Sequence, residues 1–467
     1  MNVRVKFLGG AQTVTGSKYL LEIDDFTLLI DCGLFQGLKK LRLRNWDDFP
    51  IDPSSIDAIV ITHAHIDHTG YLPKIVQQGF QGPVYCTDAT ARLMEILLLD
   101  SAKLQEEEAE WARKKGYSKH DPPLPLYNTE DAQKALKLLR PYHFDEEVSL
   151  HDKVSFKFHN AGHILGAAIV EMVLKGQQQQ KAIVFSGDLG RYNDPILRDP
   201  TPMPYADILF IESTYGNRDT ISEFPADELM KVVNEAFDHN GCLIIPAFAV
   251  GRTQTVIYYL RILMEAKKIP EAPIYIDSPM AINVTGLYKE FFPYHKLREQ
   301  DLENSISIFD YKHLHYTHSR EASMKINSIE RHAIIISASG MCTGGRILHH
   351  LYHRLPHEND TILFVGYQAE GTRGRDILEG KENIRMFGTE VPVRCHVRQI
   401  EGLSAHADKE ELLLWVENFR EPPKRTFIVH GEIESATAFA NTLYEACQWQ
   451  NVFVPNYLES FELFQNI

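Results

Sequence analysis

The feature that most constrains this chain is the segment His63-Ala64-His65-Ile66-Asp67-His68. It directly follows the apolar run IVIT, which predicts a buried strand. Three imidazoles and one carboxylate within six residues supply the nitrogen and oxygen ligands that Zn²⁺ takes in proteins. A tight loop can also divide alternate residues between two neighbouring metal ions. The segment therefore predicts a metal site at the end of a strand.

Further ligand candidates lie in other loops, and they are needed because a zinc ion takes about four ligands. His163 is flanked by glycines, which let the backbone approach closely. Asp188 ends the strand-like run KAIVFSGD, and its two carboxylate oxygens can bridge two cations. Asp31 ends the run FTLLID and can orient metal ligands through hydrogen bonds. Together these residues predict a metal site built from several strand ends.

Strand and helix patterns divide the chain into regions. The first third opens with strand patterns, and the runs KYLLEI and FTLLID around Asp24-Asp25 predict a hairpin. From about Arg218 onward, helices alternate with buried strands, which favours a parallel sheet with helices on both faces. Near Pro392 strand-like alternation resumes and is followed by an amphipathic helix. The patterns therefore predict an α/β fold with a second domain in its middle.

Composition limits the classes of function. The formal net charge of −15 argues against sequence-independent attraction to nucleic acid, although two zinc ions would reverse the local sign. No apolar run reaches the ~18 residues of a membrane helix, and the first ten residues lack the apolar core of a signal peptide. The six cysteines are scattered without a CxxC pair. We expect a cytoplasmic protein with reduced thiols and no membrane contact.

The order of Asp31, the HxHxDH segment, His163 and Asp188 resembles the metallo-β-lactamase superfamily. This resemblance implies an αββα sandwich with two zinc ions per chain and a bridging hydroxide as the nucleophile of a hydrolysis. Zinc lowers the pKa of bound water from 15.7 towards ~7, so such a nucleophile is available at neutral pH. The implied ligands are His63, His65 and His163 for one zinc and Asp67 and His68 for the other, with Asp188 between them.

Three later residues resemble the additional motifs of the β-CASP branch, which processes RNA and DNA. They are Glu212 in IESTYG, His406 in LSAHAD and His430 in TFIVHGE. The resemblance implies that His430 completes the second zinc site and that His406, oriented by Glu212, protonates the leaving 3′ oxygen. It also implies a parallel-sheet α/β (β-CASP) domain inserted into the sandwich. The expected parts are residues 1–217, 218–392 and 393–467, and the expected catalytic residues are Asp31, Asp67, Glu212 and His406.

Candidates for binding substrate phosphate follow strands of the inserted region. Each combines glycine, hydroxyl groups and a guanidinium, which together can hold phosphate oxygens. These candidates are Arg252, Ser337, Ser339, Arg346 and Arg373. The first strand pattern begins at the start of the chain and little follows the last helix, so we expect a minimal two-domain nuclease.

The expected function is zinc-dependent hydrolysis of phosphodiester bonds in single-stranded RNA, with 5′-phosphate and 3′-hydroxyl products. Endonuclease and 5′-to-3′ exonuclease action both fit the motifs, as do DNA as a substrate and a homodimeric assembly. The alternative enzyme is a small-molecule metallohydrolase acting on an ester, thioester or lactone, which the net charge favours. A scaffold without activity is a third class, but every expected ligand position is filled.

Overall fold

The computed structural model describes residues 1–115, 123–176, 179–219, 225–297 and 309–467. The chain forms two compact units. Unit 1 contains Met1–Asp194, Arg198–Asp219 and His406–Ile467, and unit 2 contains Pro195–Leu197 and Thr220–Ala405. Unit 1 is therefore interrupted in sequence by unit 2, and each is described by itself.

The first sheet of unit 1 begins with antiparallel strands and continues with parallel ones. Its strands, in spatial order, are β22 (Ser460–Phe464), β1 (Val3–Gly9), β2 (Lys18–Ile23), β3 (Phe26–Ile30), β4 (Ala58–Val60), β5 (Val84–Thr87) and β6 (Leu139–Tyr142). The hairpin expected around Asp24-Asp25 is confirmed, because β2 and β3 pair antiparallel with Ile23 opposite Phe26. Strands β3 to β6 pair in parallel.

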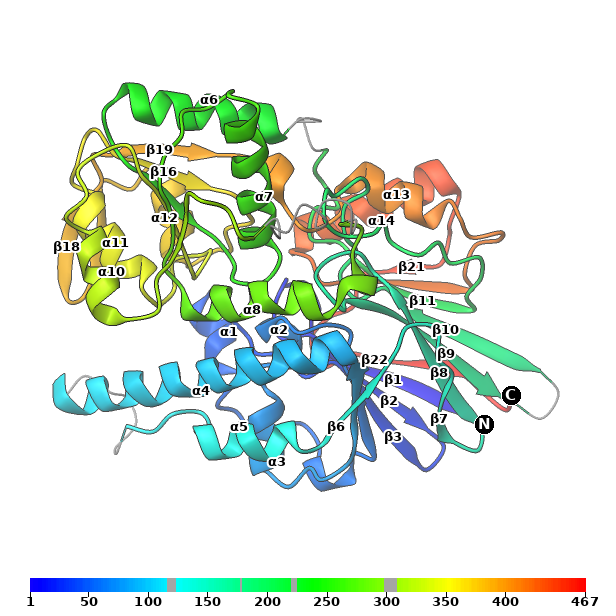
Figure 1. Ribbon diagram of the computed structural model, residues 1–467. Coiled ribbons are helices and arrows are strands. Elements are labelled where there is room, and N and C mark those ends of the chain that lie inside the picture. Colours follow the sequence, from blue (N-terminus) through cyan, green and yellow to red (C-terminus); the bar gives the residue numbers. More distant parts are fainter. Residues whose placement is uncertain (116–122, 177–178, 220–224, 298–308) are drawn as a thin grey trace. The chain divides into compact units, whose positions relative to one another are not determined.

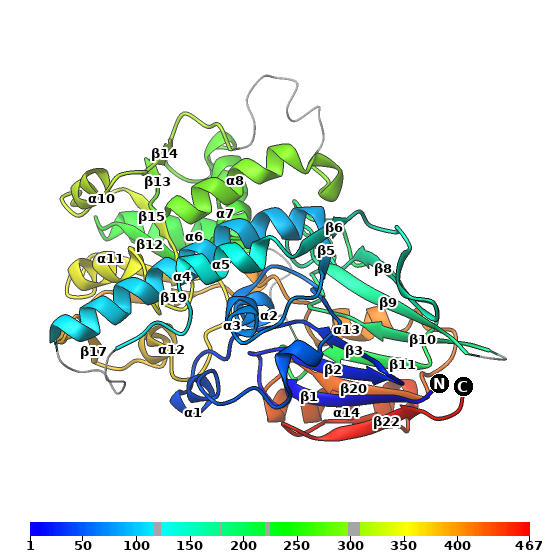
Figure 2. The same ribbon diagram turned by 90° about the horizontal axis from the view of Figure 1, so that it is seen from below.

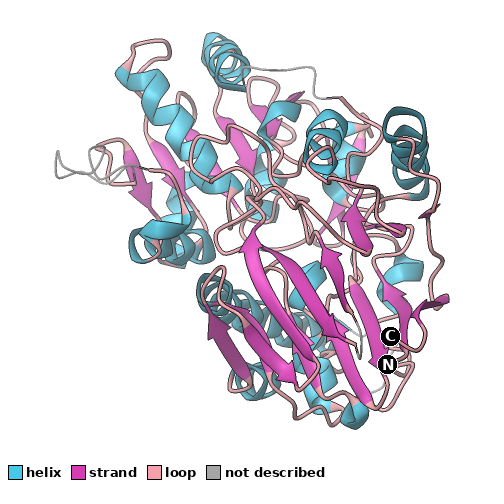
Figure 3. Ribbon diagram, turned by 90° about the vertical axis from the view of Figure 1, so that its right-hand side faces the viewer, coloured by secondary structure: helices cyan, strands magenta, loops and turns pink. Residues whose placement is uncertain are grey.

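The second sheet of unit 1 is also mixed. Its strands, in spatial order, are β21 (Val452–Phe453), β20 (Arg425–Val429), β11 (Ile208–Glu212), β10 (Gln180–Phe185), β9 (Ala168–Lys175), β8 (Val154–Asn160) and β7 (Val148–His151). Strands β10, β11 and β20 are parallel neighbours. The strands of both sheets are magenta in Figure 3. Segments that precede and follow unit 2 in the sequence therefore share this sheet.

The two sheets pack face to face over one apolar core. Side chains from both contribute, including Phe7 and Leu28 from the first sheet and Val170, Phe210 and Phe427 from the second. Burying such side chains stabilises the fold by about 1.5–3 kcal/mol each. The helices of unit 1 are α1 (Lys39–Leu43), α2 (Ile66–Thr69), α3 (Leu72–Gln77), α4 (Asp88–Lys115), α5 (Thr129–Leu136), α13 (Lys409–Val416) and α14 (Ile433–Cys447).

Helices flank this pair of sheets on both outer sides. Figures 1 and 2 place α3, α4 and α5 beside the first sheet, whereas α14 contacts β20 and β21 of the second. This arrangement confirms the expected αββα sandwich. The two ends of the chain lie side by side, where the Met1 amino group donates to the Ile467 carbonyl at 2.9 Å.

Unit 2 is built on a parallel sheet, as expected. Its strands, in spatial order, are β14 (Leu314–Tyr316), β13 (Ile274–Ile276), β15 (Ile334–Ser337), β12 (Leu243–Pro246), β16 (Thr361–Phe364) and β19 (His396–Gln399), and all neighbouring pairs are parallel. Its helices are α6 (Pro225–Asp238), α7 (Arg252–Glu265), α8 (Pro279–Glu290), α10 (Arg320–Ile326), α11 (Ile347–Arg354) and α12 (Arg373–Leu378). A separate antiparallel hairpin joins β17 (Asn383–Met386) to β18 (Thr389–Pro392).

All six cysteines are free thiols, and only Cys447 is not buried. Among the helices of the described ranges, none is both long enough and apolar enough to cross a membrane.

Candidate metal centre

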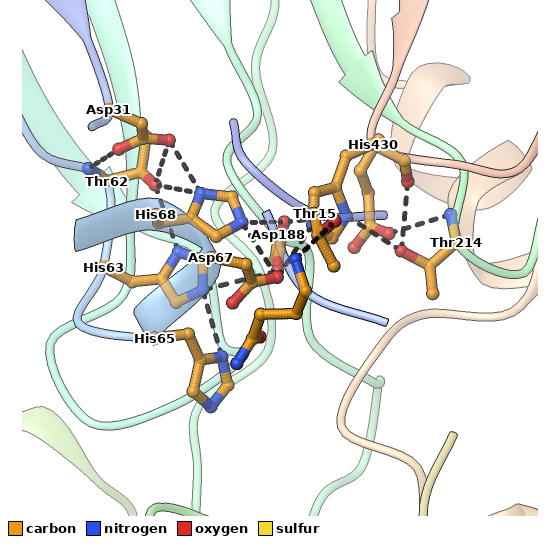
Figure 4. A network of polar contacts seen from close by, with 12 residues as sticks. Thr15, Asp31, Thr62, His63, His65, Asp67, His68, Asp188, Thr214 and His430 are labelled. Atoms are coloured by element: carbon orange, nitrogen blue, oxygen red, sulfur yellow. Dashed lines mark hydrogen bonds and ion pairs between the residues drawn. The ribbon is translucent and has the colours of Figure 1, made fainter. Parts of the chain in front are cut away.

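Unit 1 brings the predicted ligands together at the ends of its strands. The HxHxDH segment follows β4, His163 lies between β8 and β9, Asp188 follows β10, and His430 follows β20. Because neighbouring parallel strands end at the same edge of a sheet, β10, β11 and β20 present their following loops together. Figure 4 shows most of these side chains, among them His68, Asp188 and His430. The fold therefore gathers residues that are far apart in the chain.

Backbone contacts hold the ligand-bearing turn in place. Asp67 and His68 lie in the short helix α2, whose carbonyl oxygens accept hydrogen bonds from outside the helix. The Ser17 N–H donates to the Asp67 carbonyl at 2.9 Å, and the Cys32 N–H donates to the His68 carbonyl at 2.7 Å. A Cβ atom on Gly33 would lie 1.5 Å from the Asp67 carbonyl oxygen. Glycine is therefore required here by the close approach of two backbone segments.

The first cluster consists of His63, His65, His163 and Asp188. The distance is 3.1 Å from His63 Nε2 to His65 Nδ1 and 3.2 Å from His65 Nδ1 to His163 Nε2. His63 Nε2 lies 3.3 Å from Asp188 Oδ2. Four ligands placed tetrahedrally about 2.0–2.1 Å from a zinc ion would be about 3.3 Å apart. The spacing of these atoms therefore fits a four-coordinate metal.

The second cluster consists of Asp67, His68 and His430, next to the same Asp188. His430 Nε2 lies 3.3 Å from Asp67 Oδ2, and His68 Nε2 lies 3.4 Å from Asp188 Oδ1. The two oxygens of Asp188 thus face different clusters. His68 Nε2 and Asp188 Oδ1 are both buried without a hydrogen-bond partner. Buried polar atoms are costly to leave unsatisfied, so their convergence fits a bound cation.

Asp31 and Thr62 hold one ligand in a defined orientation. Asp31 Oδ2 lies 2.8 Å from His68 Nδ1, and Asp31 also accepts from the Thr62 N–H at 2.8 Å and the Thr62 hydroxyl at 2.9 Å. A carboxylate beside Nδ1 favours the tautomer with the proton on that nitrogen. The lone pair of His68 Nε2 then points towards the clusters.

Burial sets the charge state of the first cluster. It lowers the pKa of His63 to about 3 and that of His65 to about 4, and it also lowers the pKa of His163. These imidazoles are therefore neutral at pH 7, as metal ligation requires. Burial alone would raise the pKa of Asp188, but the neighbouring imidazoles of His430, His68 and His63 lower it. The carboxylate is therefore ionised.

His406 and Glu212 form a pair beside the clusters. His406 Nδ1 lies 3.1 Å from Glu212 Oε1, and the His406 ring centroid lies 4.4 Å from that of His163. Glu212 is fully buried and accepts from the backbone N–H groups of Leu189 at 2.7 Å and Thr214 at 3.2 Å. Burial opposes protonation of His406, but the Glu212 carboxylate outweighs it and raises the pKa. The Glu212 carboxylate therefore favours the protonated form of His406.

The phosphate-binding candidates lie in unit 2, where several also serve its internal structure. Ser337 Oγ donates to the Asp277 carbonyl at 2.8 Å, and Arg346 Nη1 donates to Asp277 Oδ1 at 2.7 Å. Arg373 Nε donates to the Arg385 carbonyl at 3.1 Å, and the Thr343 N–H donates to Ser339 Oγ at 3.0 Å. Arg252 is buried at the start of α7. Their role in binding phosphate stays a prediction.

Sequence reasoning did not single out three residues that support the centre. Thr62 donates to Asp31, Thr214 Oγ1 lies 3.1 Å from His430 Nδ1, and Gly33 permits the close approach to α2. Thr62 immediately precedes the HxHxDH segment and Thr214 is two residues after Glu212. For the two threonines, a hydroxyl next to a ligand-bearing strand end is the sequence signal that could have identified them.

Three protein-family models match consecutive parts of the chain. They are the metallo-beta-lactamase superfamily at residues 13–227, the Beta-Casp domain at 253–377, and the Zn-dependent metallo-hydrolase RNA specificity domain at 390–455. The matches follow the order in which unit 1, unit 2 and the return to unit 1 occur along the chain.

Similar proteins extend over nearly the whole chain. Ribonuclease TTHA0252 of Thermus thermophilus is 37% identical over 449 residues, which cover 94% of this chain and 96% of that protein. Transcription termination factor FttA of Methanocaldococcus jannaschii is 31% identical over 99% of this chain and 72% of its own length. An RNase J-like protein of the same organism is 29% identical, with 98% of each chain covered. The chain therefore belongs to the β-CASP nucleases of the metallo-β-lactamase superfamily and is a hydrolytic enzyme.

A solved structure supports the fold. A protein of unknown function from Enterococcus faecalis V583 matches with a TM-score of 0.52 over 99% of this chain and all of that chain. Its sequence is 12% identical, so this likeness concerns the fold alone.

Proposed function

We propose that this protein is a cytoplasmic zinc-dependent ribonuclease that hydrolyses phosphodiester bonds of single-stranded RNA in RNA processing or decay. The observation that carries the proposal is the pair of buried clusters that share Asp188, whose Oδ2 lies 3.3 Å from His63 and whose Oδ1 lies 3.4 Å from His68. RNA is chosen as the substrate because a ribonuclease with 37% identity matches over 94% of the chain.

Two zinc ions would be held by residues already in place. His63, His65 and His163 would hold one, Asp67, His68 and His430 would hold the other, and Asp188 would contact both. When bound, two such ions supply an activated water and stabilise the attacking and leaving oxygens of an in-line displacement. Asp31 contributes by fixing the orientation of His68 through the 2.8 Å contact with Nδ1.

His406 would supply the proton for the leaving group. An alkoxide is a poor leaving group, so protonation of the 3′ oxygen in the transition state lowers the barrier. The Glu212 carboxylate, 3.1 Å from His406 Nδ1, orients the ring and favours its protonated form. The opposite ring nitrogen, Nε2, is the atom that would donate. The reaction would leave a 5′-phosphate and a 3′-hydroxyl.

Residues of unit 2 would bind the phosphates of the strand. A guanidinium matches two phosphate oxygens with parallel N–H groups, and hydroxyl groups add further donors. The proposed contacts are made by Arg252, Ser337, Ser339, Arg346 and Arg373. The Arg346 guanidinium already donates to Asp277 and to the carbonyls of Thr317 and His318, so it would bind phosphate with the few donors that remain.

The test is cleavage of end-labelled single-stranded RNA by the purified protein, with zinc and with a chelator. We expect zinc-dependent cleavage, loss of cleavage with chelator, and 5′-phosphate ends on the products. The His65→Ala variant should lose both cleavage and bound metal, because His65 Nδ1 lies within 3.2 Å of two other ligands. Hydrolysis of small esters without any RNA cleavage would instead support the alternative enzyme class.

A further inference from the structure

The hairpin of β17 and β18 in unit 2 turns through an unusual pair of residues. Its loop is Phe387-Gly388, and both residues have positive φ, 50° and 86°. Two-residue hairpin loops of this kind favour Asn, Asp or Gly at the first position, because a side chain with a Cβ is strained there. Phe387 nevertheless leaves 51% of its surface exposed. Local stability alone would therefore select another residue at this position.

The strands of the hairpin bury apolar side chains in the usual way, so the unusual residue is confined to the turn. Ile384, Met386 and Val391 are buried in the core beneath the sheet of unit 2. These three side chains attach the hairpin, and the Phe387 ring is not among them. A residue that breaks a local rule without serving the core is a candidate for function.

The Phe387 ring lies against aromatic side chains of helix α11. Its centroid is 4.7 Å from that of His349, and the planes are nearly parallel at 23°. Tyr352 approaches edge-on, with centroids 5.8 Å apart, and is 39% exposed. His349 and Tyr352 are three residues apart and so lie on the same side of the helix. The three rings form a continuous surface, which we name the aromatic platform (Phe387, His349 and Tyr352).

Charged groups of both signs lie near the aromatic platform, since Arg320 lowers the pKa of His349 and Asp277 raises it. Helix α11 contains no acidic residue, and burial together with His350 and Arg320 lowers the pKa of His349, so its ring is neutral at pH 7. Arg385 is exposed on the hairpin but lies opposite Glu390, which offsets its charge. Asp277 is buried and paired with Arg346, whereas Arg320 is exposed and supplies accessible positive charge near His349. Exposed rings beside a guanidinium are the features on which single-stranded nucleic acids stack.

We propose that the aromatic platform stacks bases of single-stranded RNA. It would add a base contact to the metal centre of unit 1 and to the phosphate contacts proposed for unit 2. This inference rests on the proposed ribonuclease function. The aromatic faces can accept any base, so the contact would be independent of sequence. It would raise affinity for the strand without taking part in bond cleavage.

The test compares Phe387→Asn with Phe387→Trp. Asparagine suits the turn, so Phe387→Asn should fold at least as well as the parent, whereas tryptophan keeps a ring. Both are made in a His406→Ala background so that RNA stays intact during binding. Fluorescence anisotropy with labelled oligouridylates of increasing length should show Kd raised by about 5-fold to about 100-fold in Phe387→Asn. In Phe387→Trp it should stay within about 3-fold of the parent, with indole fluorescence quenched by RNA.

A matched control and separate outcomes keep the test decisive. Tyr444→Asn removes an aromatic ring that is 61% exposed on α14 and should leave Kd unchanged. If the parent neither binds nor cleaves RNA, the proposed function fails. If the parent binds RNA but Phe387→Asn binds it equally well at every length, the proposed RNA contact of the aromatic platform is wrong. A changed sedimentation coefficient in Phe387→Asn with unchanged Kd would assign the surface to a second copy of the chain, which also overturns the proposal.

Discussion

His406→Ala should slow RNA cleavage far more than it slows cleavage of an activated phosphodiester. A general acid contributes about 10²–10⁴ in rate, which corresponds to about 3–5 kcal/mol of transition-state stabilisation. We therefore expect kcat on RNA to fall by about this factor. A p-nitrophenyl phosphodiester releases a stable phenolate, which needs no proton. The fall in kcat on this substrate should therefore stay below about 10-fold.

The structure also predicts the pH dependence of this step. Burial lowers the pKa of His406, but the Glu212 carboxylate 3.1 Å away raises it above the ordinary value. His406 donates only when protonated, so kcat should fall as pH rises through its pKa. In Glu212→Gln the raising charge is lost while burial remains, so this fall should move to lower pH. The assay is kcat against pH for RNA, from about pH 5 to about pH 9.

The matched control is another carboxylate and histidine pair in unit 1. Glu171 Oε2 lies 2.9 Å from His159 Nε2, and the two residues stand on the neighbouring strands β9 and β8. Glu171→Gln should leave both kcat and its pH profile unchanged. Equal losses on RNA and on the p-nitrophenyl ester in His406→Ala would refute the assignment, because a proton donor cannot matter to a leaving group that needs none.

Three further predictions concern the metal centre and the mode of cleavage. Gly33→Ala places a Cβ 1.5 Å from the Asp67 carbonyl, so it should destabilise the protein by at least about 1–3 kcal/mol and reduce bound metal, as measured by denaturation and elemental analysis. Asp188→Asn should lower bound zinc from two ions per chain to fewer than one. Adding zinc at about 1,000 times its Kd to the metal-free parent should stabilise it against thermal unfolding by about 4 kcal/mol, whereas the variant should gain no such stability. Circular RNA should be linearised if the enzyme acts internally, and resistance of the circle with degradation of the same linear strand would restrict it to ends.

Part of the fold followed from local patterns, because strands such as β3 and β12 are short runs of mostly apolar residues. The runs KYLLEI and FTLLID predicted the hairpin of β2 and β3, and the alternation of helices with buried strands from about Arg218 onward predicted the parallel sheet that contains β12. The pairing of His396–Gln399 with β16 could not be predicted, since no local pattern shows which distant strand will be its neighbour. The same limit applies to the β17 and β18 hairpin, whose turn residues give no recognised turn signal.

The metal ligands were predictable for a different reason. Metal chemistry restricts residue type, so His63, His65 and Asp67 stand out at once in sequence. Supporting groups are less restricted, because many residues can donate a hydrogen bond. Thr62 and Thr214 were therefore apparent only once Asp31 and His430 had been placed in space. The net charge of −15 did not indicate the substrate, because a total over the whole chain does not give the charge at one local site.

The most direct test of the central claim is a zinc titration of metal-free protein with RNA cleavage followed at each step. We expect cleavage of single-stranded RNA to appear as zinc fills the paired clusters, to saturate at two zinc ions per chain, and to be absent from Asp188→Asn at every ratio. Full cleavage by metal-free protein, or no cleavage when two zinc ions per chain are bound, would contradict it.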